Sequence, residues 1–294
     1  MGTAESETKG QEVKEREYIS LTEAGTRFIL TLCQVEDVWG FIVSLVSYQH
    51  RGFSAIAGLL SVMDAEARQK YLAIVEKGPG KADELSRNEG LIFQMLFCRV
   101  IDGFLAYLSL LLASILQSKP EVLRSGDSIK VETVLQHDNM EDLIRDLAEN
   151  KVYELSRKGS AEMERYFSER LGLKVFNADE DADEAMRYVQ VRNLIVHNHG
   201  IVNKAFLQRV SNYPAKVGET VALSMDDVLD VMSVSAKVVC SLDVRAAKKF
   251  DLKTPTNAGD LARANQHYCV SRAYFDLQKA VNEERIAART IESP

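Results

Sequence analysis

The 294-residue sequence has few of the residues that interrupt helices or cross-link a fold. It contains five prolines, and because proline breaks helix interiors, this scarcity favours a helical protein. The four cysteines lie far apart, without any C-x-x-C pair, at Cys33, Cys98, Cys240 and Cys269. This spacing fits neither a disulfide framework nor a zinc site, so we expect free thiols in a reducing cytoplasm.

The sequence also lacks a secretory signal and an apolar run long enough to cross a membrane. Its first 18 residues are polar, and although MGTAES formally matches a myristoylation signal, such short motifs recur by chance. The most apolar run, residues 103–116, has 14 residues, whereas a membrane span needs about 20. We therefore expect a cytoplasmic protein without a membrane partner, in which residues 103–116 form a buried helix.

The charge balance is acidic. There are 36 Lys and Arg residues against 43 Asp and Glu residues, which gives a formal net charge of −7. Proteins that bind nucleic acid over their whole surface are usually basic, so this balance argues against that class. It leaves room for an RNA enzyme with one small basic cleft. The phosphate loop G-x-x-x-x-G-K-[ST] is absent, and we expect neither a cofactor nor a metal.

Apolar residues at helical spacing are abundant and predict an all-α protein. Capping boxes at residues 138–141 and 177–180, and Ser224, are expected to begin helices. Gly159 and Gly200 are expected to end helices. The predicted helices span residues 21–48, 54–76, 89–117, 138–159, 160–172, 177–198, 224–242 and 259–288.

The predicted helices group into four parts. A turn at Gly78-Pro79-Gly80 ends the first group, and Pro120 stops the long apolar helix. A polar connector with one short extended stretch precedes the helix that Ser224 begins. The parts are a flexible tail over 1–18, an N-terminal helical layer over 19–85, a core bundle over 89–245 and a C-terminal helical arm over 250–294.

Residues with catalytic potential lie at the end of the helix predicted over 177–198. Asn193 and His197 are four residues apart, so they share one helix face, where the amide can orient the imidazole. Arg192 lies five residues before His197 and about 140° around the helix, so a single helix clamps a phosphate poorly. Two copies that face each other across a two-fold axis would each contribute an arginine and a histidine to a shared cleft.

This segment resembles a known family. Arg192-Asn193-x3-His197 matches the R-x4–6-H signature of HEPN domains, and the continuation His-Asn-x-Gly-Ile-Val-Asn is similar to that of many bacterial members. The apolar helix with Arg99 and Asp102, and the Lys-Pro-Glu that follows it, are similar as well. The resemblance covers about residues 90–245 and implies an HEPN-like helical bundle with an added N-terminal layer and a C-terminal helix.

The resemblance also implies an activity. HEPN ribonucleases are usually homodimeric, metal-independent endoribonucleases, and here Arg192, Asn193 and His197 would form the catalytic site. The ribose 2′-hydroxyl would be the nucleophile, and the products would carry 2′,3′-cyclic phosphate ends. Histidine moves protons near neutral pH, and arginine presents a fixed fork of donors to a phosphate. Such an enzyme would act on RNA in stress response or phage defence.

Residues around the motif are expected to bind substrate. Arg187, Asn198, His199 and Lys204 are the candidates, with Arg209 as a further phosphate contact. Most have a plainer interpretation: Asn198 as a helix cap, His199 as a surface or cap residue, and Lys204 and Arg209 as ordinary surface residues. Arg187 would lie at the edge of the cleft. The acidic residues 179–184 would complement the helix dipole, with a metal site as the alternative.

One position departs from a toxin branch of the family. In that branch a tyrosine stands two residues after the histidine, and a partner nucleotidyltransferase modifies it; here the position is His199. We therefore expect control by oligomerisation, by the extra helical layers or by another regulatory protein partner.

Two other interpretations stay open. A non-catalytic HEPN-like module that binds RNA or protein is favoured by the acidic net charge. A purely structural helical protein that contains the motif by chance is the second. In that case His197 would only cap a helix C-terminus, where a cation is favoured.

Overall fold

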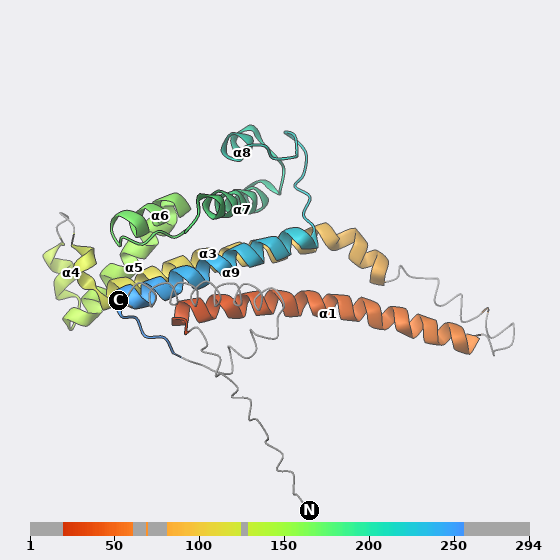
Figure 1. Ribbon diagram of the computed structural model, residues 1–294, viewed down its shortest axis with the longest axis horizontal. Helices are drawn as coiled ribbons and strands as arrows, with labels where there is room; N and C mark the ends of the chain where they lie inside the picture. Colours follow the sequence, from red (N-terminus) through yellow and green to blue (C-terminus); the bar gives the residue numbers. More distant parts are fainter. Residues whose placement is uncertain (1–19, 61–68, 70–80, 125–128, 256–294) are drawn as a thin grey trace, which may run out of the picture.

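A computed structural model describes residues 20–60, 69, 81–124 and 129–255, and within these ranges the chain is all-α, as expected (Figure 1). The described residues contain a single isolated bridge, between Ile201 and Thr220, in place of the predicted extended stretch. The helices are α1 (Glu23–Leu60), α3 (Lys81–Ser118), the 3-10 helix η1 (Pro120–Leu123), α4 (Val131–Leu135), α5 (Met140–Lys158), α6 (Ser160–Glu169), α7 (Asp179–Asn198), α8 (Lys204–Arg209) and α9 (Met225–Phe250).

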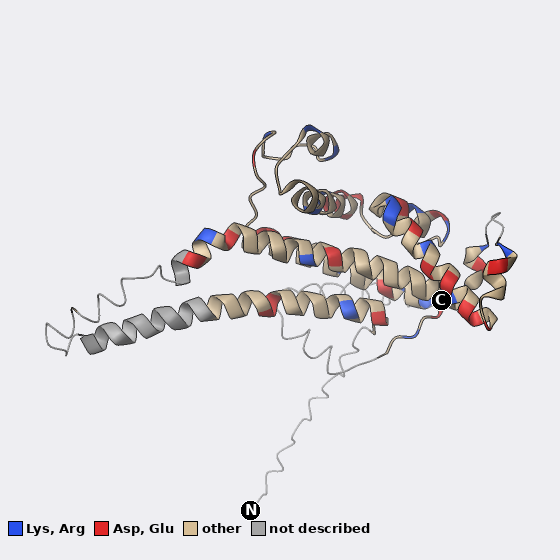
Figure 2. Cartoon of the chain, turned by 180° about the vertical axis from the view of Figure 1, so that it is seen from behind, with Lys and Arg blue, Asp and Glu red and all other residues tan. Residues whose placement is uncertain are grey.

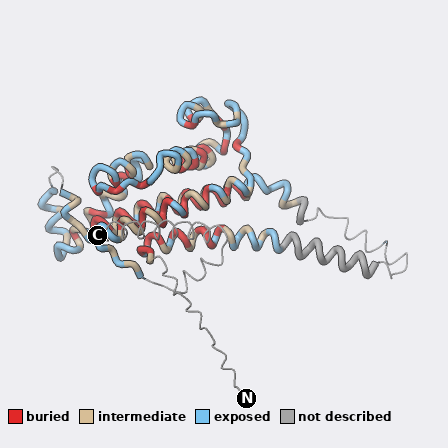
Figure 3. Tube along the Cα trace, viewed as in Figure 1, coloured by how far each residue is buried: buried red, intermediate tan, exposed pale blue. Residues whose placement is uncertain are grey.

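Three long helices, α1, α3 and α9, lie side by side, and α3 contacts both of the others (Figures 1 and 2). The helices α5 and α7 also pack on α3, and α6 packs on α5. The α8 segment lies outermost, against α7. Figure 3 shows that the buried residues follow the facing sides of these helices. The α3 helix is therefore the centre of the bundle.

The apolar side chains of α3 explain its central place. Residues Glu84–Ser118 are long and apolar enough to cross a membrane by length and composition, and 56% of their most apolar window is buried inside the protein. Each fully buried leucine contributes about 1.5–3 kcal/mol to folding. The predicted run of residues 103–116 is therefore a core helix, whose most buried large side chains are Tyr107, Leu111, Leu112, Ile115 and Leu116.

A buried carboxylate connects the start of α1 to α9. Asp243 has no exposed surface and accepts hydrogen bonds from the Thr22 backbone N–H and the Thr22 hydroxyl, both at 2.6 Å. The same hydroxyl oxygen accepts a bond from the Gly25 N–H at 3.2 Å, so Thr22 caps α1. A Cβ atom on Gly25 would lie 2.7–2.9 Å from the Asp243 carboxyl group, which leaves room for glycine alone.

The capping predictions had mixed outcomes. The helix predicted to begin at Ser224 does so, and reciprocal bonds between Ser224 and Asp227 form a capping box there. The helix predicted from residue 138 is capped instead by Asn139, whose side chain accepts from the Asp142 N–H. The capping box predicted at Asn177 is wrong, because its side chain turns away from its own helix toward α9.

Several boundaries also differ from the predictions. The first two predicted helices join in α1 through Leu60, since glycine at position 52 does not end the helix. The third begins at Lys81, eight residues early, and α9 continues to Phe250. Short helices occupy the predicted connectors: η1 and α4 in 118–137 and α8 in 203–224. The predictions for 1–18, the turn at 78–80, the helix at 259–288 and Cys269 lie outside the described residues.

We expect the variant Ser224→Ala to lower the free energy of unfolding by about 1 kcal/mol, the usual loss for an N-cap. The Ser224 oxygen accepts from the Asp227 N–H at 3.3 Å, and alanine leaves that N–H without its partner. Urea denaturation measures the change. Ser211→Ala, at an exposed serine outside any helix, is the control, and equal stability of the two variants would contradict the assigned cap.

Candidate functional site

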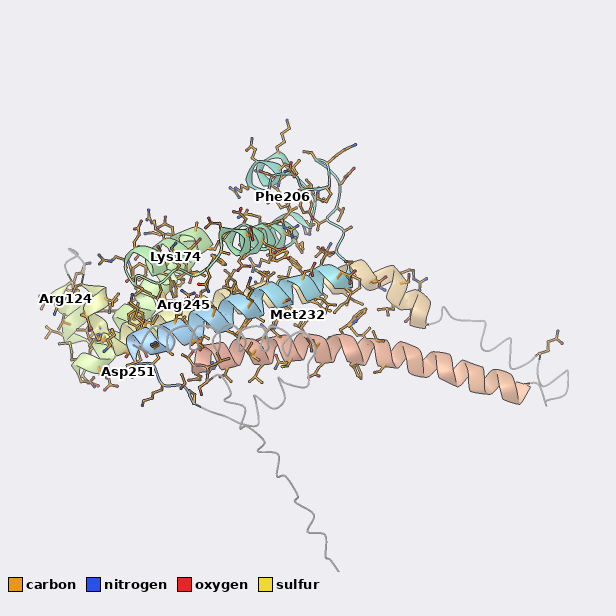
Figure 4. The ribbon with its side chains drawn as sticks, viewed as in Figure 1. Arg124, Lys174, Phe206, Met232, Arg245 and Asp251 are labelled. Carbon is orange, nitrogen blue, oxygen red and sulfur yellow. The ribbon has the colours of Figure 1, made fainter. Side chains whose placement is uncertain are left out.

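The α7 helix, which carries the Arg192–His197 motif, is fixed at its beginning by α9. Three α9 side chains four residues apart lie on one face of that helix and contact α7 or the loop before it. The acidic start of α7 therefore includes a structural ion pair. The contacts are Lys237 to Asp181 at 2.9 Å, Ser241 to Asn177 at 2.8 Å and Arg245 to the carbonyl oxygen of Lys174 at 2.7 Å (Figure 4).

The far end of α7 turns sharply after the motif. His199 has the left-handed conformation, with φ 52°, and Gly200 follows with φ 72°. The Gly200 N–H donates to the carbonyl oxygen of Leu194 at 3.1 Å, which closes the helix end. The helix ends at Asn198, close to the stop predicted at Gly200, and His197 lies in its last turn.

The three predicted catalytic residues line one groove. Arg192, Asn193 and His197 of α7 lie along a groove of about 880 Å³ whose other walls come from α3, α5, α6 and α8. Four cationic side chains and one histidine contribute to its lining, and no carboxylate residue is among the described lining residues. On a chain of net charge −7, this groove is suited to an anion. Its cations are Arg157, Lys158, Arg192 and Arg209.

Arg192 is held in place from two directions. Its Nε and Nη2 atoms both lie 2.7 Å from Oδ1 of Asp102 on α3, and Nη1 donates to the Asn193 side-chain oxygen at 3.1 Å. The Arg192 side chain is only 22% exposed. Because each terminal nitrogen carries two hydrogens, both keep an N–H that can bind a phosphate oxygen. Asp102 therefore orients the guanidinium and offsets part of its charge.

The structure alters the expected role of Asn193. Its side-chain oxygen accepts from Arg192, and among the described residues it forms no hydrogen bond with His197. His197 is exposed, and within the described residues no hydrogen bond involves its ring. The imidazole is thus free to approach a ligand in the groove, and Asn193 acts on the arginine instead.

Of the residues predicted to contact substrate, Arg209 lines the groove, whereas the other four do not. Arg187 pairs with Glu184 at 3.2 Å and lies over the Tyr188 ring. Asn198 donates to the Ile201 carbonyl oxygen and so stabilises the turn. The exposed side chains of His199 and Lys204 lie at the α7 cap and at the first residue of α8. The plainer interpretations of these residues fit the structure better.

The groove also contains residues that the motif did not identify. Arg157, Lys158 and Gln190 line it, and Asp102 holds the Arg192 guanidinium. Only Asp102 had a sequence signal, as a carboxylate inside an otherwise apolar helix, where a charge needs a partner. Arg157 and Lys158 look like ordinary residues at a helix C-terminus.

The described cysteines are free thiols, as expected. Burial, with the negative charge of Asp102, raises the pKa of Cys98 beside the groove to about 11, although Arg192 opposes the shift. Burial likewise raises the pKa of Cys240 to about 12. Both thiols stay protonated at neutral pH and are poor nucleophiles. In the part of the chain that is described, no three His, Cys, Asp or Glu side chains are grouped to hold a metal ion.

Comparisons with protein-family models, with curated proteins and with solved structures found no significant match to this chain. The geometry of the groove and the sequence motif therefore carry the functional argument.

Proposed function

We propose that this protein is a metal-independent endoribonuclease of HEPN type. One observation carries the proposal: Arg192, Asn193 and His197 line one groove that is rich in cations and has no carboxylate among its described lining residues. A polyanion fits this charge, and RNA brings its own nucleophile. The site then needs groups that bind a phosphate and move protons, and arginine and histidine are such groups.

In the proposed reaction the 2′-hydroxyl attacks the adjacent phosphorus, and the bond from phosphorus to the 5′-oxygen breaks. The products are a 2′,3′-cyclic phosphate and a 5′-hydroxyl. The 2′-hydroxyl loses a proton and the 5′-oxygen gains one; His197 accepts the first or donates the second, and solvent water makes the other transfer. The remaining N–H groups of Arg192 bind the non-bridging oxygens, where negative charge develops. Asn193 and Asp102 position that guanidinium.

We further propose that two copies of the chain combine their motifs across a two-fold axis. Exposed apolar side chains next to the motif support this arrangement. Val196 is 48% exposed, Ile201 43% and Val217 53%. Apolar area of this kind is favourable to bury between subunits. A homodimer would thereby place two histidines and two arginines at one cleft.

A non-catalytic RNA-binding module is the second candidate. The ion pair between Arg192 and Asp102 favours it, because part of the arginine charge is already offset. Such a module would bind RNA and leave it intact, whereas the enzyme would cut it.

The proposal is tested by incubating the full-length protein with an end-labelled, structured RNA in EDTA. We expect cleavage that leaves 2′,3′-cyclic phosphate ends, from a protein that sedimentation shows to be a dimer. RNA that is bound but intact would favour the second candidate. Cleavage that requires an added metal, or that leaves a 3′-hydroxyl, would overturn the proposed chemistry.

A further inference from the structure

A second groove lies beside the first. Its volume is about 890 Å³, and its walls come from η1, α4, α5 and α6 together with the residues next to them. The first groove uses the opposite side of the α5–α6 connection. Lys158, at the C-terminal end of α5, lines both grooves, and Gly159 follows it with φ 101° in the turn to α6. The two grooves therefore meet at this turn.

The second groove is also cationic. Six basic side chains line it against the three carboxylates of Glu154, Glu162 and Glu169. An excess of positive charge is unexpected on a chain with seven more acidic than basic residues, so it marks a surface for an anion. The six are Arg124, Lys130, Lys151, Lys158, Arg165 and Arg170.

Three of these cations are available to a ligand. Among the described residues, no acidic side chain forms an ion pair with Arg124, Lys130 or Arg170. Arg170 donates to the carbonyl oxygen of Arg124 at 2.7 Å, which fixes the end of η1. Lys130 is exposed at the N-terminus of α4. Arg165, in contrast, pairs with Glu162 at 2.7 Å.

The groove also offers an aromatic and apolar surface. Tyr166 lies in its wall, with the Lys151 ammonium 5.8 Å from the ring centre. Burial raises the pKa of Tyr166, so the ring stays neutral at physiological pH. Ile144 and Leu147 add half-buried aliphatic surface. Cations that follow a backbone, beside an aromatic ring on which bases stack, are typical of sites for single-stranded nucleic acid.

From these features we infer that a single RNA strand leaving the first groove, which contains the motif, crosses the α5–α6 turn at Lys158 and continues in the second groove. Its phosphates face Lys158, Lys130 and Arg124, and its bases pack against Tyr166. This inference rests on the proposed function and extends it, because it makes single-stranded RNA the preferred substrate on one side of the cleavage point.

One carboxylate in the second groove should repel the RNA phosphates, so its removal should change the affinity in the opposite direction to the removal of a cation. Glu154 lies between Lys151 at 2.9 Å and Lys158 at 2.5 Å. Hydrogen bonds from these two lysines lower the pKa of Glu154 to about 2, so it is ionised in any ordinary buffer. Replacing Glu154 by glutamine releases both ammonium groups to a phosphate. Removing this acid should therefore tighten RNA binding, whereas removing nearby cations should weaken it.

The test compares two unstructured RNAs of about 5 and about 20 nucleotides, a range that brackets common single-strand sites. Their 2′-O-methyl forms cannot be cleaved, so the affinity of the full-length protein is measured without turnover. For the double variant Arg124→Gln/Lys130→Gln we expect roughly 3- to 10-fold weaker binding of the longer RNA, with a shallower salt dependence. Binding of the shorter RNA should not change.

Glu154→Gln should bind the longer RNA roughly 2- to 5-fold more tightly. Lys216→Gln is the control for the loss of positive charge in the double variant, because it removes a positive charge at an exposed residue that lines neither groove. Unmodified RNAs are assayed for cleavage in parallel. If the wild type cuts RNA but the groove variants bind both lengths as it does, the inference is wrong and the proposed function stands. If the wild type leaves the unmodified RNAs intact but the groove variants change affinity as expected, the strand path stands and the enzyme proposal fails.

Discussion

Replacing His197 by alanine is expected to reduce the rate of RNA cleavage by about 10²- to 10⁴-fold, the usual contribution of a general acid or base. The imidazole is exposed, and no hydrogen bond within the described residues depends on it. The stability of the fold should therefore change by less than about 0.5 kcal/mol. The rate is measured under single-turnover conditions in EDTA, and stability by urea denaturation.

The neighbouring histidine provides a close control for this experiment. His199 is also exposed and lies two residues further along, but it does not line the groove. Because its backbone is left-handed, with φ 52°, asparagine is the least disruptive replacement. His199→Asn should keep the wild-type cleavage rate. Equal activity of His197→Ala and wild type would show that the chemistry lies elsewhere.

The second large effect concerns folding. Asp243→Ala is expected to lower the free energy of unfolding by about 3–5 kcal/mol, because it leaves the N–H and the hydroxyl of Thr22 without their partner and opens a cavity. Urea denaturation measures the loss. Asp230→Ala, at an exposed position of the same helix, should cost much less. Similar losses for the two variants would contradict the structural role of the buried carboxylate.

Gly25 gives an independent check on the same contact. A methyl group there would meet the Asp243 carboxyl at under 3.0 Å, so Gly25→Ala should be strongly destabilising although alanine favours helices. Asp243→Ala removes the atoms that the methyl group meets. The two losses should consequently be less than additive in the double variant.

The pH dependence of the Asp243 contribution has a defined sign. Burial raises the pKa of this carboxyl group above its ordinary value, although the Thr22 hydrogen bonds oppose the shift. The stability that the protonated group provides is complete below the ordinary carboxyl pKa and is lost as pH rises through the raised pKa. Asp243→Asn does not titrate. Its stability relative to wild type should therefore increase as pH rises through that range.

Helical periodicity was sufficient to predict the fold class and most of the helices. It could not give the exact ends, because those depend on partners distant in sequence. Asn177 fits a capping box locally, yet its amide donates to Ser241 on α9. The short helices η1, α4 and α8 lie within polar segments, where no apolar repeat signals a helix.

The residues of the candidate site likewise fall into those that the motif identifies and those that only the fold brings together. Arg192, Asn193 and His197 follow one another on α7, so a motif can identify them. Lys158 and Asp102 come from two other helices, and only packing brings Lys158 to the groove and Asp102 to the Arg192 guanidinium. Arg209 was predicted as a phosphate contact, and it does line the groove. Conversely, Lys204 and Arg187 are close to the motif in sequence but not in the groove. Sequence proximity to the motif therefore added residues that lie outside the groove and missed lining residues from distant helices.

The bond between Thr22 and Asp243 also has a consequence for how the chain is made. It joins residues 221 positions apart, so α1 leaves the ribosome long before the carboxylate that completes its capping exists. In the interval α1 can pack on α3, which follows it closely, but its first turn lacks the Asp243 acceptor and keeps an open apolar edge. The α9 helix thus completes the packing of α1. A nascent chain that stops short of α9 would expose that apolar edge to chaperones and proteases.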